Sequence, residues 1–241
     1  MKQSLLITGA SRGVGRALAL ACARSGQYSK IILNSRSDAA ALEETSRLAA
    51  SAGDLLCMSS LGDVGLLDYV EELRRRFGPA DVLINNAAVS QTGLLTEMAP
   101  EEWDRLIRTN VTSLYNTCHT YVPDMIHAGR GRILNISSVW GLVGASCEVA
   151  YSASKGAVNA FTRALAKELA PSGIPVNALA LGIVDTRMNA HLTERETAEI
   201  LSQIPAGTVM SPEEAAQAAL RLLEMPPYLT GEVVRMDGGW I

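Results

Sequence analysis

The chain has 241 residues, of which 48% are hydrophobic and 19% charged, and its formal net charge is −4. This is the composition of an ordinary globular protein, and without a basic stripe it gives no reason to expect a nucleic-acid partner. The sequence holds no apolar stretch of about 18 residues, so we expect no membrane span. Four cysteines without a Cys-x-x-Cys pair and three scattered histidines predict free thiols in a reducing cytoplasm and no metal site.

Strand-like and helix-like segments alternate along the chain. The predicted strands are residues 3–8, 29–34, 55–58, 80–85, 132–137, 176–181 and 231–236. The predicted helices are residues 13–25, 39–52, 64–77, 100–125 with a break near Thr112, 149–170, a helix pair within 188–203, and 212–225 after the N-cap Ser211. Strands joined through such helices form right-handed βαβ units and a parallel sheet. We therefore predict an α/β fold with one doubly wound domain over residues 1–241.

A glycine-rich segment joins the first predicted strand to the first helix. Gly9 permits a tight turn, whereas Gly13 and Gly15 leave room where the backbone meets a pyrophosphate and where the helix packs on the strand. A helix start also offers free N–H groups and the positive end of the helix dipole to a phosphate. The segment predicts a dinucleotide site, and the alternative is a glycine-rich turn without a ligand. Its full sequence is Thr8-Gly9-Ala10-Ser11-Arg12-Gly13-Val14-Gly15.

The end of the second predicted strand indicates which dinucleotide binds. A free ribose 2′-OH is usually bound by a carboxylate there, but this chain has Asn34-Ser35-Arg36. Arg12 and Arg36 are both placed to bind a 2′-phosphate through paired hydrogen bonds. We therefore expect NADPH rather than NADH. The alternative is that both arginines are solvated surface residues.

Three further residues predict the chemistry. Tyr151 and Lys155 lie one turn apart on the same face of a predicted helix, and Ser138 ends the fifth strand beside it. Tyrosine ionises near pH 10, and a nearby ammonium group lowers that pKa. We predict that Tyr151 donates a proton to a carbonyl, that Lys155 lowers the pKa of Tyr151, and that Ser138 orients the carbonyl. A Tyr-x-x-x-Lys pair alone is a weak signal, and the glycine loop makes it specific.

Together these segments resemble the short-chain dehydrogenase/reductase family over the whole chain. The resemblance implies a Rossmann sheet of seven parallel strands with helices on both faces, and a homotetramer. It also implies that Asn110 is catalytic and helps to hold a water near Lys155. Ala88 and Leu181 depart from the glycine and proline usual at their positions, and Ser60 replaces an acid. The further predicted cofactor-binding residues are Ser35, Ser60, Leu61, Asn86, Ala87, Tyr151, Lys155, Val184 and Thr186, and Lys155 is expected to bind the nicotinamide ribose.

Within the family, the chain is most similar to bacterial ketoacyl-acyl-carrier-protein reductases. Segments around Trp140, Glu148 and Met188 resemble a branch that reduces a 5-aminopentanone carried on elongation factor P. A carboxylate and an indole both attract cations, so we predict that Glu148 and Trp140 face a cationic substrate. The alternative is that Glu148 is a solvated loop charge and that Trp140 packs against a neighbouring subunit.

The sequence therefore predicts an NADPH-dependent carbonyl reductase that converts a ketone to a secondary alcohol. Its substrate would be carried on elongation factor P or, as the alternative, on the acyl carrier protein of fatty-acid synthesis. A second alternative is a dinucleotide-binding protein without turnover. The intact set of Ser138, Tyr151, Lys155 and Asn110 argues against that second alternative.

Overall fold

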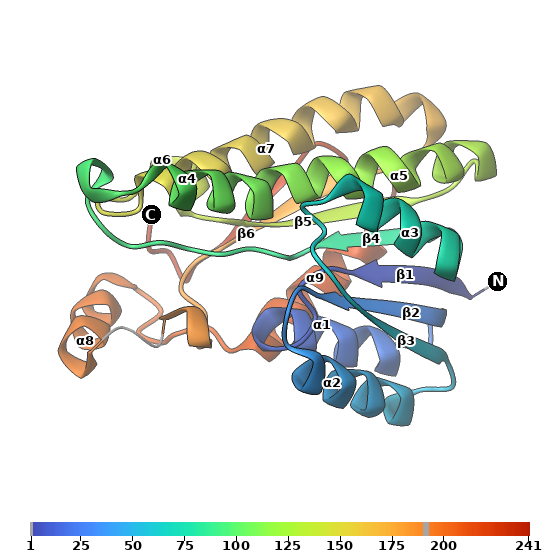
Figure 1. Cartoon of the computed structure of the whole chain (residues 1–241). Coiled ribbons are helices and arrows are strands. Elements are labelled where there is room, and N and C mark those ends of the chain that lie inside the picture. The colour runs from blue at the N-terminus through green and yellow to red at the C-terminus, as the bar shows by residue number, and fades with distance from the viewer. Residues whose placement is uncertain (1, 190–192) are drawn as a thin grey trace.

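A computed structural model describes residues 2–189 and 193–241 of the chain. Seven parallel strands form one sheet in the order β3-β2-β1-β4-β5-β6-β7 (Figure 1). The fold class is therefore the predicted one. The strands are β1 Gln3–Ile7, β2 Tyr28–Ser35, β3 Leu56–Leu61, β4 Val82–Asn85, β5 Arg132–Ser138, β6 Val176–Leu181 and β7 Val233–Met236.

Helices cover both faces of this sheet. In Figure 1, α1, α2 and α9 lie on one face, while α3, α4, α5 and α7 lie on the other. The α-helices are α1 Gly13–Arg24, α2 Ala39–Ala52, α3 Leu67–Phe77, α4 Pro100–Ile107, α5 Ser113–Ala128, α6 Trp140–Val143, α7 Val149–Leu169, α8 Glu194–Gln203 and α9 Pro212–Glu224. Shorter turns are η1 Leu95–Glu97, the π-helical η2 Arg108–Thr112, η3 Ala170–Ser172 and η4 Arg187–Asn189. None of the helices in the described part of the chain is both long and apolar enough to cross a membrane.

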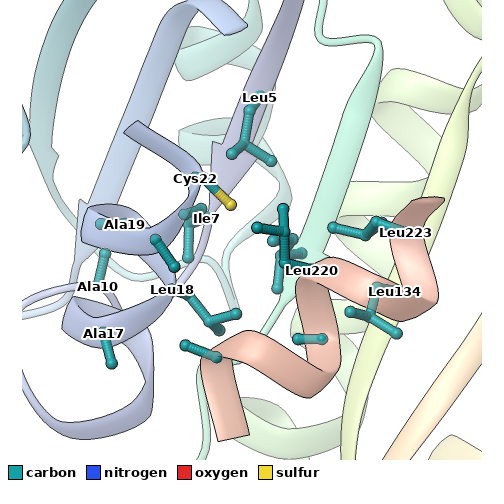
Figure 2. Close-up of a cluster of buried hydrophobic side chains, with 14 of the residues drawn as sticks. Leu5, Ile7, Ala10, Ala17, Leu18, Ala19, Cys22, Leu134, Leu220 and Leu223 are labelled. Carbon is teal, nitrogen blue, oxygen red and sulfur yellow. The ribbon is translucent and has the colours of Figure 1, made fainter. Parts of the chain in front are cut away.

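The alternation of side chains along β1 divides the core into two layers. Leu5 and Ile7 belong to a buried cluster with α1 and α9, and Figure 2 shows Leu220 and Leu223 of α9 opposite them. Leu6 belongs to a second cluster, on the face covered by α3, α5 and α7. Successive side chains of a strand point to opposite faces, and a parallel sheet buries both of them. The continuous apolar run of β1 follows from this.

The strand order reverses between β1 and β4. From β1 the chain crosses through α1 to β2, whereas from β3 it crosses through α3 to β4 on the other side of β1. The helices that follow β1 and β4 therefore lie on opposite faces, and they leave a crevice beyond the carboxyl ends of these strands. The residues that follow β1, β2, β4, β5 and β6 surround this crevice.

The predicted helix over residues 100–125 is interrupted near Thr112, as the sequence indicated. The interruption is the π-helical turn η2 between α4 and α5. Two hydroxyl groups, one within this turn and one directly after it, bond back to the helix: Thr109 Oγ1 donates to the carbonyl of Arg105 (2.8 Å) and Ser113 Oγ to that of Thr109 (2.6 Å). Such bonds bend helices, and π-helical turns are frequent at functional sites.

Candidate active site

A cleft of about 650 Å³ opens at the carboxyl ends of the strands. It brings together segments that are far apart in the sequence, from the glycine loop to the amino-terminal half of α7. The predicted cofactor residues on its wall are Gly9, Ser11, Arg12, Gly13, Val14, Gly15, Ser35, Arg36, Asn86, Ala87, Val184 and Thr186. The predicted reaction and substrate residues on its wall are Ser138, Tyr151, Lys155, Trp140 and Glu148.

The glycine loop forms a cradle, and a larger residue would not fit well at its three glycine positions. Gly9 and Gly13 adopt left-handed backbone angles (φ +66° and +52°), which glycine tolerates best. A Cβ atom added to Gly15 would lie 2.1 Å from the carbonyl oxygen of Gly9. Asn86, the residue after β4, donates from Nδ2 to the carbonyls of Thr8 (3.0 Å) and Gly9 (3.1 Å) and so fixes the loop from the side.

The first turn of α1 faces the cleft. The N-cap residue Arg12 forms no side-chain cap hydrogen bond. The first N–H groups of a helix have no partners within the helix, and the positive end of its dipole lies beside them. This cradle of backbone N–H groups and close-packed glycines fits the pyrophosphate of a dinucleotide.

The two predicted phosphate-binding arginines differ in their surroundings. Arg12 forms an ion pair with Asp38 (Nη2 to Oδ2, 2.5 Å), while the other oxygen of Asp38 accepts from the N–H of Ala41 and caps α2. Arg36 is exposed and pairs with no acidic group among the residues that the structure describes. Arg36 therefore contributes a full positive charge to this end of the cleft, whereas Asp38 partly neutralises that of Arg12.

The three predicted reaction residues meet where β5 approaches α7. All are buried: Ser138 is 7% exposed, Tyr151 8% and Lys155 3%. Ser138 and Tyr151 both line the cleft. Lys155 Nζ lies 5.7 Å from the centre of the Tyr151 ring and donates to the carbonyl of Ile136 (2.8 Å). The geometry thus places a phenol, an ammonium group and a second hydroxyl at one point on the cleft wall.

The predicted direction of the Tyr151 pKa is wrong. Burial raises this pKa above its ordinary value, and the negative charge of Glu148 raises it further, while the hydrogen bond from Ser138 opposes both. Tyr151 is therefore protonated at neutral pH, which is the form that can give a proton away. Burial lowers the pKa of Lys155 to about 8, so this amine still carries its charge at neutral pH in most molecules.

Asn110 lies in the π-helical turn and is buried, but its side chain is not on the cleft wall. Its Oδ1 accepts from the N–H of Val89 (2.8 Å), and its Nδ2 donates to the carbonyl of Val89 (2.8 Å) and to Ser154 Oγ (3.0 Å). The side chain therefore ties the loop after β4 to α7. The water-binding role implied by the family resemblance stays a prediction.

Ser60 and Leu61 do not line the cleft. Ser60 Oγ accepts from the hydroxyl of Tyr69 (2.8 Å), and Leu61 is 48% exposed. The cleft wall has Asp63 and Val64 at this edge instead. The sequence predicts that the third strand ends at residue 58, but β3 continues to residue 61. The expected cofactor contacts at residues 60 and 61 therefore fall within the strand and not after it.

The cleft also contains residues to which the sequence gave no individual role in binding or reaction. Trp240, from the carboxyl-terminal tail, meets Trp140 in an edge-on contact with ring centres 4.7 Å apart. Arg105 of α4, Met188 of η4 and Ile200 of α8 complete this side of the wall. They come from separate elements, and only the tertiary fold shows that they face one another. Part of the predicted helix pair, residues 190–192, lies outside the described residues.

Comparison with known proteins agrees with this site. The family model described as short chain dehydrogenase matches residues 3–197. YmfI of Bacillus subtilis, an uncharacterized oxidoreductase, is 37% identical, with 100% of this chain and 99% of the relative aligned. The 3-oxoacyl-[acyl-carrier-protein] reductases FabG of Escherichia coli (35% identical; 97% and 95% aligned) and Chlamydia muridarum (34%; 99% and 97%) are also similar. The chain thus belongs to the short-chain dehydrogenase/reductase family and is an oxidoreductase that acts on alcohol and ketone groups with a nicotinamide dinucleotide.

Proposed function

We propose that this protein reduces a ketone to a secondary alcohol with NADPH. The observation that carries the proposal is that three buried side chains, Ser138, Tyr151 and Lys155, meet at one place on the cleft wall, with Lys155 Nζ 5.7 Å from the centre of the Tyr151 ring. These groups lie on the wall of the same cleft as the glycine cradle. A dinucleotide held by the cradle therefore shares one cavity with a proton donor.

The chain's own residues supply the proton and the charge stabilisation. A nicotinamide dinucleotide held by the glycine cradle would supply the hydride that a carbonyl carbon needs. Ser138 donates a hydrogen bond to the carbonyl oxygen, where negative charge develops. Tyr151 transfers its phenolic proton to that oxygen, and the ammonium group of Lys155 stabilises the phenolate that remains. The burial of all three groups strengthens these interactions because little water screens them.

The preference for NADPH rests on the charges beside the second strand. Ser35 ends β2 without a carboxylate, and its hydroxyl donates to Ser11 Oγ (3.1 Å) beneath the loop. The guanidinium of Arg36 is available for a 2′-phosphate, whose charge the fork of an arginine matches well. Arg12 can join it by exchanging its carboxylate partner, Asp38, for the phosphate.

For the substrate, we propose a ketone that carries a cation, such as the aminopentanone on elongation factor P. Glu148 lies at the N-cap of α7, on the cleft wall, and its charge raises the pKa of Tyr151. Trp140 adds an indole ring to the same wall. A carboxylate and an aromatic face together favour an ammonium group over a neutral acyl chain.

The test compares two substrates with purified protein and NADPH. Loss of NADPH absorbance is measured with aminopentanone-bearing elongation factor P and with an acetoacetyl thioester. We expect the first to be the better substrate. The reverse preference would favour the second candidate, reduction of an acyl-carrier-protein ketoester, which the names of the Escherichia coli and Chlamydia muridarum relatives support. Binding of NADPH without turnover of either substrate would favour a non-catalytic dinucleotide-binding protein.

A matched pair of small ketones isolates the charge. One is a methyl ketone with a trimethylammonium arm, and the other has a tert-butyl group of the same shape in its place. We expect Glu148→Gln to raise KM for the charged ketone by about tenfold, which corresponds to the loss of one close charge interaction. The KM for the neutral ketone should stay the same. An equal change for both ketones would contradict recognition of a cation.

We also propose a homotetramer and a cytoplasmic location. Large apolar side chains on α4 and α5 are exposed, including Trp103 (37%), Tyr115 (49%) and Ile126 (48%), and contact between copies would bury them. The four cysteines are free thiols, which suits a reducing compartment. Light scattering of the purified protein tests the assembly, and a monomer at micromolar concentration would contradict it.

A further inference from the structure

We infer that the carboxyl-terminal tail, residues 237–241, forms a wall of the substrate site and that Trp240 determines which ketones bind well. The inference rests on the proposed ketone reduction and adds a specificity-determining residue to it. Trp240 lines the same cleft as Tyr151 and is half-buried. No motif of the sequence indicates this role, because the residue lies after the last strand.

The two indole rings at this end of the cleft form one surface. The ring centres of Trp140 and Trp240 are 4.7 Å apart, and the ring planes meet at 60°. This is an edge-to-face arrangement, which is favourable between aromatic rings. Both residues line the cleft, so the surface that they share faces the substrate space.

The tail is held in place by a defined set of contacts. The Asp237 carboxylate is buried (8% of the residue is exposed) and accepts hydrogen bonds from the N–H groups of Gly239 (3.0 Å) and Ile241 (3.1 Å). Gly238 and Gly239 adopt positive φ angles of +66° and +84°, which turn the chain back toward the cleft. Trp240 therefore stands on a tight, hydrogen-bonded turn.

The same tail also meets the segment that follows α8. The N–H of Ala206 donates to the carbonyl of Gly238 (3.1 Å), and a Cβ atom on Gly238 would lie 2.8 Å from Cβ of Ala206. Trp240 Nε1 lies 3.5 Å from Oε1 of Gln203, at the end of α8. The tail is thus packed between α8 and Trp140.

Trp140 links this wall to the reaction residues. Its backbone N–H donates to Ser138 Oγ (3.2 Å), and its side chain packs against the small cluster that contains Tyr151. A ketone whose oxygen reaches Ser138 and Tyr151 therefore extends its longer arm along Trp140 toward Trp240. The structure predicts a preference for ketones with a bulky apolar or cationic arm, since both are attracted to indole surfaces.

The experiment replaces Trp240 by Ala and by Phe, with Tyr228→Ala as the matched control. Tyr228 follows α9, is 98% exposed and does not line the cleft. The probes are butanone, which has no arm, and the methyl ketone with a tert-butyl arm. We expect Trp240→Ala to raise KM for the armed ketone about tenfold, as for loss of one aromatic contact, with kcat little changed. Butanone should show no change, and Trp240→Phe should recover most of the affinity.

A spectroscopic readout tests the ring contact without turnover. Two indoles in contact give an exciton couplet in the circular dichroism spectrum. We expect this couplet in the unaltered protein and in Trp103→Phe, and we expect its loss in Trp240→Phe. A couplet that persists without Trp240 would overturn the contact.

The kinetic outcomes separate this inference from the proposed function. If the unaltered protein reduces both ketones and Trp240→Ala changes neither KM, or raises both equally, the role of Trp240 is refuted and ketone reduction stands. If the unaltered protein binds NADPH but reduces neither ketone nor the two larger substrates, the proposed function fails and the role of Trp240 falls with it.

Discussion

Replacement of Lys155 by Met should stabilise the protein while it abolishes activity. Lys155 is 3% exposed, and burial lowers its pKa from 10.5 to about 8. A shift of about 2.5 units corresponds to roughly 3 kcal/mol at 1.36 kcal/mol per unit, which the folded protein loses by keeping the ammonium group buried. The Met side chain leaves the carbonyl of Ile136 without its donor, which costs about 1 kcal/mol. The net gain at pH 7 is about 2 kcal/mol.

The sign of the pH dependence follows from the same pKa. Below pH 8 the Lys155 amine is protonated in both the folded and the unfolded chain, so the folded protein bears the full loss of stability that comes from burying the charge. Between pH 8 and 10.5 the unfolded chain holds more protons than the folded one, and the free energy of unfolding rises with pH. Burial raises the pKa values of Cys22 and Cys118 to about 12, which has the opposite effect on stability. The unaltered protein and Lys155→Met both contain these thiols. The difference between their free energies of unfolding, followed against pH, therefore reports on Lys155 alone.

The assay is urea unfolding of both proteins at pH 7 and at pH 10, at one protein concentration. At pH 7 the variant should be more stable by about 2 kcal/mol, or about 5 °C in Tm for a chain of this size. At pH 10 most of this advantage should be gone. A variant that is less stable at pH 7, with the same pH dependence as the unaltered protein, would refute the claim that a buried charge at Lys155 destabilises the fold.

Three further substitutions test the site. Tyr151→Phe should lower kcat about a thousandfold and leave the Kd for NADPH unchanged, and normal turnover would exclude Tyr151 as the proton donor. Arg36→Ala should weaken NADPH binding at least about tenfold in a fluorescence titration but spare NADH, whereas equal losses would remove Arg36 from the phosphate site. Gly15→Ala should cost about 1–3 kcal/mol and weaken dinucleotide binding, because its Cβ would meet the Gly9 carbonyl at 2.1 Å. The matched control Gly156→Ala meets nothing closer than 3.8 Å and should stabilise α7 by up to about 1 kcal/mol.

Local patterns predicted most of the secondary structure. The helix over residues 39–52 and the strand over 176–181 have the predicted bounds, and the capping box of Ser211 and Glu214 starts α9 at Pro212. These signals are local, since a cap or an alternation of apolar residues depends only on neighbours in the sequence. The four-residue helix α6 gave no such signal, because so short a segment has no periodicity to detect.

For the site, too, local patterns predicted some features and missed others. The glycine loop and the set of Ser138, Tyr151 and Lys155 were identified from spacing and resemblance, and the structure places all of them on one cleft. The cofactor contacts predicted after the third strand, Ser60 and Leu61, do not line the cleft, whereas Asp63 and Val64 do. The sequence marks the ends of strands only weakly, and this explains the difference of a few residues. The direction of the Tyr151 pKa was wrong, because charge spacing along a helix says nothing about burial.

The sequence alone determined the alternation of strands and helices, the glycine cradle and the reaction residues, because each depends on residues that are close together along the chain. The tertiary structure decided which segments face one another across the cleft. It brought Trp240 from the carboxyl terminus to Trp140, paired Arg12 with Asp38 and buried Tyr151 deeply enough to raise its pKa. Such contacts and the local polarity depend on how distant elements pack, and no local pattern encodes that packing.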